Sequence, residues 1–496
     1  MRNLRLIMLA VVVLFASCTS NKETVKTPKY VFYFIGDGFG LAHAQVAEKY
    51  LQDTQGDSCR LVMNSFSDIA LYSTFCTNRF ITGSAAAGTA LSTGEKTTVN
   101  TIGMANDKKT PLKSIAERFR DNGYKVGVVT SVSIDHATPA AFYAHQPSRN
   151  MYYNISLELS KSGFNYFAGG DFMHPKGDGE INDYNLAANI GLAKGVKVSD
   201  KPNSVDIAKK RGYRIVKSRE DFFKLKNGDD KVVCFPTRLE GGNTCYYAID
   251  QTKDDLNLVD FTSKGIELLD NPKGFFMMVE GGKIDWAAHA NCISTVVKDV
   301  LQFDQAIAKA VEFYKKHPEE TLIIVCSDHE TGGLAMSSNT KHYDSEYSLI
   351  KHQDISYEMF AKLVEQLKNK TRGKASFNKG MALVKKHFGL GDKAKGLELS
   401  KFEMAQLKKA FKYSMSDNKP KKDEAFFAEY GYYDPLTVTA CHIMAEKIGV
   451  AWGSFNHTST PLPVRALGVG SKIFEGMMDN TDIPNKIQAI SKLNIE

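Results

Sequence analysis

The chain has 496 residues, of which 43% are apolar and 24% are charged. These fractions are ordinary for globular proteins, and they exclude a collagen-like, a largely disordered or a polytopic membrane protein. Lysine and arginine total 63 against 56 aspartates and glutamates, which gives a net charge of +7. On a chain of this length the excess does not indicate nucleic-acid binding, although it suits an anionic substrate.

Residues 1–17 are predicted to be a secretory signal peptide. Two arginines precede the apolar run of residues 6–15, and Ala16-Ser17-Cys18 follows it. A basic start, a short apolar core and small residues at the cleavage point are typical of such signals, and the run is too short to span a bilayer. The ending resembles a bacterial lipobox, in which the cysteine is lipidated. We therefore expect a lipid on Cys18 and export to the periplasm or the outer membrane of a bacterium. The alternative is an ordinary signal peptide with an unrelated cysteine.

Residues 18–28 are mostly polar and are interpreted as a tether, so that the folded part of the chain begins at residue 29. Seven further cysteines follow Cys18, and none of them lies in a C-x-x-C spacing. This argues against a thiolate zinc site. Because seven is an odd number, these cysteines cannot all form disulfides with one another. A hairpin bracketed by Cys234 and Cys245 stays open, and most of the seven are expected to be buried as small apolar residues.

Short apolar runs alternate with helical patterns along the rest of the chain. The run of residues 30–35 ends at Gly36-Asp37-Gly38, which is typical of a buried strand that stops at a tight turn. Further strands are predicted at residues 125–130, 274–279, 321–326 and 463–469, and helices at residues 111–122 and 295–317. This alternation predicts an α/β fold with a mostly parallel central sheet and helices on both faces.

The segment of residues 372–429 differs in composition from its surroundings. It is rich in lysine and has helical patterns at residues 379–388 and 397–413, without a strand-like apolar run. We interpret it as a helical insertion beside the sheet.

Acidic residues follow three of the predicted strands where each strand ends. Asp37 follows the first, Glu280 and Asp285 follow the strand of residues 274–279, and Asp328 with His329 follows that of residues 321–326. Ligands of open α/β sheets bind at the carboxyl ends of the strands. A single aspartate there is usually only a turn former, but three such places in one chain favour a functional site.

The pair Asp285 and His289 has the spacing i, i+4, which places both side chains on one face of a helix. A carboxylate and an imidazole at this spacing suit half of a zinc site, and a structural pair is the alternative. His457 lies in a polar stretch that is predicted to be a loop, which favours a ligand over a core histidine.

Small residues surround Ser84 in the stretch Thr82-Gly83-Ser84-Ala85-Ala86-Ala87-Gly88-Thr89-Ala90. They allow close approach of the backbone, and they are consistent with a helix whose N-terminus faces an anion. The alternative is a patch of tight helix–helix packing. No G-x-S-x-G elbow is present, so an acyl-transfer hydrolase is not indicated.

Together these stretches resemble the alkaline phosphatases. Six motifs occur in the order of that family: residues 34–40, 82–97, 136–149, 279–285, 327–329 and 457–458. The resemblance covers about residues 30–485 apart from the helical insertion, and it implies one catalytic domain at residues 29–496.

The resemblance implies a role for each matching residue. Ser84 matches the nucleophile that becomes phosphorylated, and Arg149 matches the residue that holds two phosphate oxygens. The implied metal ligands are Asp285, His289 and His457 for one zinc, Asp37, Asp328, His329 and the Ser84 oxygen for a second zinc, and Asp37, Thr138 and Glu280 for a third metal, usually magnesium. Two zincs roughly 4 Å apart suit the attacking and leaving oxygens of phosphoryl transfer, and zinc activates a serine that has no histidine base.

Three residues depart from patterns common in the family. Gly83 stands where many members have an aspartate that orients the arginine, so we expect Arg149 to be held less firmly. His136 stands where some bacterial members have a third-site aspartate, and Trp286 where others have a lysine or histidine near the phosphate. Both are expected in the vicinity of the substrate, and the identity of the third metal stays open.

The implied function is hydrolysis of phosphate monoesters through a phosphoserine on Ser84. The alternatives are a phosphodiesterase or sulfatase of the same superfamily, and a surface glycan-binding lipoprotein whose site is inactive. The C/S-x-P-x-R pattern of sulfatases is absent at Ser84, and every zinc-ligand position is filled, which favours the phosphomonoesterase. Because the family is usually dimeric, we expect a homodimer.

Overall fold

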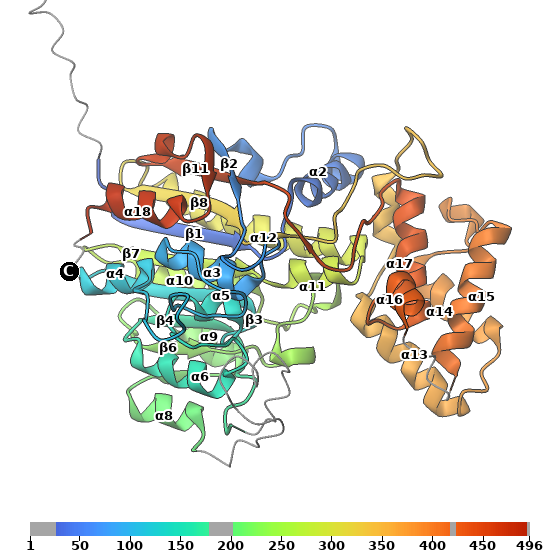
Figure 1. Ribbon diagram of the computed structural model, residues 1–496, viewed down its shortest axis with the longest axis horizontal. Helices are drawn as coiled ribbons and strands as arrows, with labels where there is room; N and C mark the ends of the chain where they lie inside the picture. The colour runs from blue at the N-terminus through green and yellow to red at the C-terminus, as the bar shows by residue number, and fades with distance from the viewer. Residues whose placement is uncertain (1–25, 178–201, 417–422, 494–496) are drawn as a thin grey trace, which may run out of the picture.

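The computed structural model describes residues 26–177, 202–416 and 423–493 (Figure 1). The predicted signal peptide, Cys18 and most of the predicted tether lie outside the described residues. At the centre is a sheet of ten strands with helices on both of its faces (Figure 1). Among the described helices, none combines the length and the apolar character needed to cross a membrane.

The sheet is almost entirely parallel. In spatial order its strands are β12 (Gly476–Asp479), β2 (Asp68–Ser73), β11 (Leu462–Gly468), β8 (Thr321–Ser327), β1 (Tyr30–Gly36), β7 (Phe275–Gly281), β3 (Lys125–Ser133), β4 (Tyr166–Gly170), β6 (Val232–Cys234) and β5 (Arg214–Val216). β11 is antiparallel to both of its neighbours, and every other pairing is parallel. The predicted α/β fold with a mostly parallel sheet is confirmed.

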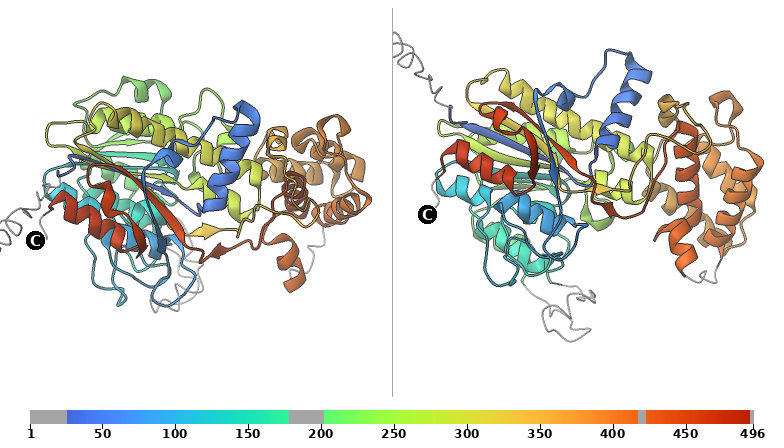
Figure 2. Two further views of the ribbon diagram at one scale, coloured as in Figure 1. Left: turned by 90° about the horizontal axis from the view of Figure 1, so that it is seen from above. Right: turned by 45° about the horizontal axis from the view of Figure 1, so that its top comes forward.

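Both faces of the sheet are covered, which explains why every residue of the central strands β1, β7 and β8 is buried. On β1, Phe32 and Phe34 pack into the core under the helices α10 (Leu258–Leu269) and α12 (Ile293–Tyr314). Val31, Tyr33 and Ile35 pack into the core under α4 (Ile115–Asp121), α6 (Tyr152–Lys161) and α18 (Asp482–Ser491). Figure 2 shows these two helical layers on opposite sides of the strands. Each of these side chains is fully buried, and burial of a side chain of this size contributes about 2–3 kcal/mol.

The helices around the sheet are α2 (Leu41–Gln55), α3 (Ser84–Thr93), α4 (Ile115–Asp121), α5 (Ala137–Ala140), α6 (Tyr152–Lys161), α8 (Ser204–Lys210), α9 (Arg219–Lys224), α10 (Leu258–Leu269), α11 (Lys283–His289), α12 (Ile293–Tyr314) and α18 (Asp482–Ser491). α4 begins later than the helix expected at residues 111–122 because Ser114 caps it. The Ser114 hydroxyl accepts from the Glu117 amide at 3.1 Å, and the Glu117 carboxylate accepts from the Ser114 amide at 2.9 Å.

A group of helices lies at one end of the molecule, beside the sheet (Figure 1). It consists of α13 (Tyr357–Thr371), α14 (Phe377–Phe388), α15 (Lys401–Met415), α16 (Glu424–Tyr430) and α17 (Pro435–Ile448). α15 packs mainly on α17, and α13 also packs on α17. The segment of residues 372–429 is therefore part of a larger helical unit. α13 and α17 lie on either side of that segment, so its lysine-rich composition did not indicate that they belong to the same unit.

The seven cysteines of the described chain are free thiols. Six are buried and Cys59 is partly exposed. No disulfide joins Cys234 and Cys245, and Cys234 lies within β6 of the main sheet. Most of these cysteines therefore pack as small apolar side chains, as expected.

His145 ties α4 to α6. Its Nε2 lies 3.4 Å from Glu117 on α4, its Nδ1 lies 3.6 Å from Glu158 on α6, and all three side chains are mostly buried. Burial opposes the charged form, but the two carboxylates outweigh it and raise the pKa of His145 to about 10. We expect His145→Gln to lower the free energy of unfolding near pH 6 by about 2 kcal/mol, typical of hydrogen bonds to charged groups.

The pH dependence of this loss has a definite sign. Because the folded pKa is raised, the stabilisation is complete below the unfolded pKa near 6.5 and is lost as pH rises through about 10. Urea unfolding at pH 6, 8 and 10.5 should show the difference between wild type and variant shrinking. His317→Gln is the control, since its pair with Glu320 is more exposed and contributes less. A difference that stays constant with pH would contradict the assignment.

Candidate active site

Three neighbouring parallel strands end at the same level, and this places their terminal acids together. β1 lies between β7 and β8, with Gly36 opposite both Gly281 and Ser327. Asp37 follows β1 directly, Glu280 is the penultimate residue of β7, and Asp328 follows β8. All three side chains are fully buried. The convergence expected from the strand ends is present.

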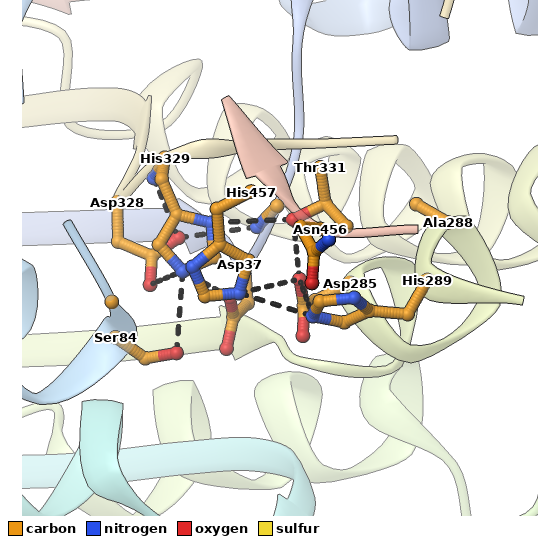
Figure 3. Close-up of polar contacts among 12 residues, drawn as sticks. Asp37, Ser84, Asp285, Ala288, His289, Asp328, His329, Thr331, Asn456 and His457 are labelled. Carbon is orange, nitrogen blue, oxygen red and sulfur yellow. Dashed lines mark hydrogen bonds and ion pairs between the residues drawn. The ribbon is translucent and has the colours of Figure 1, made fainter. Parts of the chain in front are cut away.

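Asp285, His289 and His457 form a first cluster (Figure 3). Asp285 and His289 lie one turn apart on α11, with His289 Nε2 3.4 Å from Asp285 Oδ1. His457 Nε2 is 3.7 Å from the same oxygen and 3.0 Å from His289 Nε2. The expectation that His457 lies in a loop was wrong in detail. It begins the two-residue strand β10 (His457–Thr458), which pairs antiparallel with β9 (Glu330–Thr331).

Backbone carbonyls determine which nitrogen of each histidine is free. His289 Nδ1 lies 2.6 Å from the Phe455 carbonyl, and His457 Nδ1 lies 2.8 Å from the Thr82 carbonyl. A carbonyl only accepts, so each Nδ1 donates and each neutral Nε2 carries a lone pair. Two lone pairs facing each other at 3.0 Å cannot form a hydrogen bond. A cation between them resolves the contact, as in metal sites whose histidines are oriented by carbonyls.

Asp37, Asp328 and His329 form a second cluster, which Ser84 joins. His329 Nε2 lies 3.2 Å from Asp328 Oδ2, 3.5 Å from Asp37 Oδ1 and 3.3 Å from Ser84 Oγ. Asp37 Oδ1 and Asp328 Oδ2 are buried and accept no hydrogen bond within the described structure. Buried carboxylate oxygens without a donor are costly, and a bound cation would satisfy both. The donor set therefore fits a metal ion.

The pKa values of the acidic side chains in the two clusters and of Glu280 are shifted by burial and by their closeness to one another. Burial raises the pKa of Asp328 to about 7 and that of Glu280 to about 8. Burial and the negative charge of Asp328 raise the pKa of Asp37 well above its ordinary value. For Asp285, burial also favours the neutral form, but the neighbouring imidazoles of His289, His457 and His329 and the hydrogen bond from Thr331 favour the carboxylate and lower its pKa well below the usual range. Divalent cations would offset this concentration of negative charge.

A third group lies on the β3 side of Asp37. Asp37, His136 and Glu280 offer ligand atoms that all lie within 4.8 Å of one another. Thr138 Oγ1 donates to Asp37 Oδ2 at 3.5 Å, and Thr130 Oγ1, at the end of the predicted strand, donates to Glu280 Oε2. Glu280 Oε1 has no hydrogen-bond partner in the described structure. Sequence reasoning missed Thr130, although its register directly opposite Glu280 on β7 explains the contact.

Arg149 meets His136. The guanidinium Nη2 lies 2.8 Å from His136 Nε2. Arginine is always the donor, so His136 must be neutral and accept, and burial and the Arg149 charge lower its pKa to about 3. The Trp286 ring stands edge-on to the His136 ring at 5.9 Å. Arg149 thus has an orienting partner that its sequence context, with Gly83 in place of an acid, did not reveal.

Ser84 is the first residue of α3, as expected, and it is buried beside His329. The packing interpretation is also true of this helix. A Cβ at Gly88 would stand 3.3 Å from both the Ala141 Cβ and the Thr138 Cα, so α3 and α5 approach closely at that glycine. The small residues therefore allow α3 to pack closely on α5, and Ser84 at the start of α3 lies at the second cluster.

The residues missed by sequence reasoning are backbone carbonyls and hydroxyls around the clusters. Thr331, two residues after His329, contacts both His329 and Asp285. Its place two residues after the Asp328-His329 pair was the only available signal. The carbonyls of Thr82 and Phe455 carry no side-chain signature at all.

Comparison with known proteins agrees with this geometry. The family model for alkaline phosphatase matches residues 28–493. The chain belongs to the alkaline phosphatase family. It is 29% identical over 482 residues to alkaline phosphatase 3 of Bacillus subtilis (strain 168), covering 96% of this chain and 91% of that protein. Alkaline phosphatase 4 of the same organism is 31% identical over 415 residues, which cover 83% and 77% of the two chains.

A solved alkaline phosphatase from the Antarctic bacterium TAB5 has a similar fold, with a TM-score of 0.62, 26% identity and coverage of 95% and 100%. A histidine-to-aspartate variant of that enzyme has Mg bound in its M3 site. Alkaline phosphatases are metal-dependent phosphomonoester hydrolases. Three groups of side chains in the described structure have ligand atoms close enough to hold a metal ion: Asp285 with His329 and His457, Asp37 with Asp328 and His329, and Asp37 with His136 and Glu280. The chain is thus a metal-dependent alkaline phosphatase.

Proposed function

We propose that the enzyme hydrolyses phosphate monoesters through a phosphoserine on Ser84, assisted by two zinc ions and a third metal, usually magnesium. The observation that carries this proposal is the position of the Ser84 hydroxyl, 3.3 Å from His329 Nε2 at the start of α3. This hydroxyl faces the same His329 nitrogen as the carboxylates of Asp37 and Asp328, where a nucleophile would be activated. No hydrogen-bonded histidine base other than the ligand His329 contacts it in the described chain.

Three groups of residues would hold the metals. They are Asp285, His289 and His457 for the first zinc, Asp37, Asp328, His329 and Ser84 for the second, and Asp37, Thr138 and Glu280 for the third metal. When bound, the zincs supply Lewis-acid stabilisation of the reacting oxygens and lower the pKa of the serine hydroxyl. The unpartnered buried oxygens of Asp37, Asp328 and Glu280 support the second and third sites.

The chain's own groups order the transferred phosphoryl group. Ser84 Oγ forms the new bond to phosphorus while the bond from phosphorus to the alcohol oxygen breaks, and water later breaks the bond to Ser84. The fork of Arg149 suits two phosphoryl oxygens, and His136 orients it by accepting a hydrogen bond from Arg149 Nη2. The N-terminus of α3 adds a positive end of a helix dipole at the same place.

The substrate class separates the proposal from its alternatives. With zinc and magnesium supplied, a panel of phosphomonoesters, phosphodiesters and sulfate esters should show the monoesters as the fastest substrates by kcat/KM. Preference for a diester or a sulfate ester would assign the chain to another activity of the superfamily. Protein that binds no metal and turns over no ester even with both metals supplied would favour an inactive surface-binding lipoprotein.

We propose that the protein is exported and held at a bacterial membrane by a lipid on Cys18. We expect Cys18→Ala to abolish labelling by a radioactive or clickable fatty acid and to release the protein from the membrane fraction. The physical reason is that the acyl chains are the anchor, each buried CH₂ contributing about 0.8 kcal/mol. Cys59→Ala, which changes a cysteine of the folded domain, is the matched control. A wild-type protein that is soluble and begins at another residue would contradict the lipobox.

We also propose a homodimer. Apolar side chains are exposed on the outer strands of the sheet and on the loop that leads to Ser84: Leu71, Met477, Phe80 and Ile81, of which Phe80 is 74% exposed. Leu71 on β2 pairs with Met477 on β12. Exposed apolar clusters of this kind are typical of interaction surfaces. Sedimentation equilibrium at micromolar concentration should return twice the mass of one chain.

A further inference from the structure

One buried hydroxyl lies between the two zinc-ligand clusters. Thr331 Oγ1 is 2.5 Å from Asp285 Oδ1, in the first cluster, and 3.3 Å from His329 Nδ1, in the second (Figure 3). Thr331 is fully buried. Thr331 is not among the proposed metal ligands or catalytic residues. Its hydroxyl nevertheless contacts one proposed ligand of each zinc, Asp285 and His329.

The direction of both hydrogen bonds follows from the chemistry of the groups. The hydroxyl has one proton, and the ionised Asp285 carboxylate can only accept it. The Thr331 oxygen therefore accepts from His329, whose Nδ1 must carry a proton. A neutral imidazole protonated at Nδ1 has its lone pair on Nε2, which is the nitrogen that faces Ser84, Asp37 and Asp328. The hydroxyl thus selects the tautomer that can bind a metal.

The backbone holds Thr331 firmly in this position. Its amide donates to the Gly38 carbonyl at 3.1 Å, and the residue pairs with His457 across β9 and β10. Gly38 has a φ of 67°, and a Cβ there would stand 2.8 Å from Thr331 Oγ1 and 2.7 Å from Asp285 Oδ1. Only glycine leaves room for this hydroxyl to reach the carboxylate at that point.

We propose that Thr331 is a positioning residue that couples the two zinc sites, holding the Asp285 carboxylate of one and fixing the His329 tautomer of the other. The inference rests on the proposed zinc sites. Without the hydroxyl, Asp285 loses a donor and the His329 Nδ1 proton loses its acceptor, so both metals meet a less ordered ligand. Hydrogen-bonded partners of metal ligands typically contribute 10–100-fold to metal affinity.

The test compares hydroxyl-free and hydroxyl-keeping variants of the full chain. Thr331→Val removes the hydroxyl and keeps the branched shape of the side chain. Thr331→Ala removes both the hydroxyl and that shape, and Thr331→Ser keeps the hydroxyl. Thr458→Val is the matched control, because that hydroxyl lies on the partner strand of the same β-ribbon and bonds to Glu330 instead of to a ligand. Zinc is titrated into each metal-free protein against a chromophoric chelator, so that the first and second binding steps are measured without turnover.

We expect both zinc-binding steps to weaken by about 10–100-fold in the valine and alanine variants. The serine variant and the Thr458→Val control should stay within about threefold of wild type, a difference under 1 kcal/mol. Thermal unfolding of the metal-free proteins reports any structural damage, and equal unfolding midpoints would show that the loss is one of metal binding.

Two results would overturn the inference in distinguishable ways. If wild type binds two zincs and both hydroxyl-free variants bind them as tightly, or weaken at one step only, Thr331 does not couple the sites although the proposed function stands. If wild type itself binds no zinc, the proposed zinc centres fail, and the role of Thr331 fails with them.

Discussion

Replacing Ser84 with alanine is expected to lower kcat by roughly four to six orders of magnitude, the range seen when a covalent nucleophile is removed. The hydroxyl beside His329 would be the atom that bonds to phosphorus, and alanine has none to offer. The zinc content should stay at about two per chain, because Asp37, Asp328 and His329 still surround the second site. Single-turnover kinetics and metal analysis of the same preparation measure both quantities.

The nucleophile can also be identified directly. Acid quenching of the wild type during turnover of a ³²P-labelled ester should leave label on the peptide that contains Ser84. Ser92→Ala is the matched control, since Ser92 lies on the same helix α3 and its hydroxyl donates to the Thr89 carbonyl far from the ligands. Label on another residue, or near-normal turnover by the Ser84 variant, would contradict the mechanism.

Replacing His136 with aspartate is expected to raise magnesium affinity at least about tenfold, equal to 1.4 kcal/mol. In the structure, His136 Nε2 accepts from Arg149, so its Nδ1 carries the proton and neither nitrogen can bind a cation while this hydrogen bond is kept. An aspartate carboxylate at position 136 has two oxygens, one to accept a hydrogen bond from Arg149 and one to bind the cation. It pairs with Arg149 and also offers a hard, charged ligand beside Asp37 and Glu280.

Magnesium titrations, by calorimetry and by activation of turnover, measure the effect of this substitution. His136→Asn is the matched control, because asparagine has the size of aspartate without its charge and should bind magnesium no better than wild type. Equal affinities of the aspartate and asparagine variants would show that position 136 does not face the third metal.

The sequence by itself determined the fold class and the edge of the sheet at which the site lies. The runs of residues 30–35, 274–279 and 321–326, which become most of β1, β7 and β8, contain no charged residue and no polar–apolar alternation, and this pattern is typical of a sheet covered on both faces. Parallel neighbours end at a common edge, so Asp37, Glu280 and Asp328 had to converge there. The spacing of Asp285 and His289 was equally local, since one helical turn determines it.

Only the tertiary structure decided the contacts between side chains that come from distant segments. The partner of Arg149 is His136, the carbonyls that orient His289 and His457 come from residues 455 and 82, and Thr331 bridges Asp285 and His329. Such contacts depend on the directions of loops and short strands after the regular elements end. Hydrophobic periodicity reports which face of a regular helix or strand is buried, and it carries no information about these directions. A hydrogen bond also forms or breaks when the distance between donor and acceptor changes by less than about one ångström, which a sequence pattern does not specify.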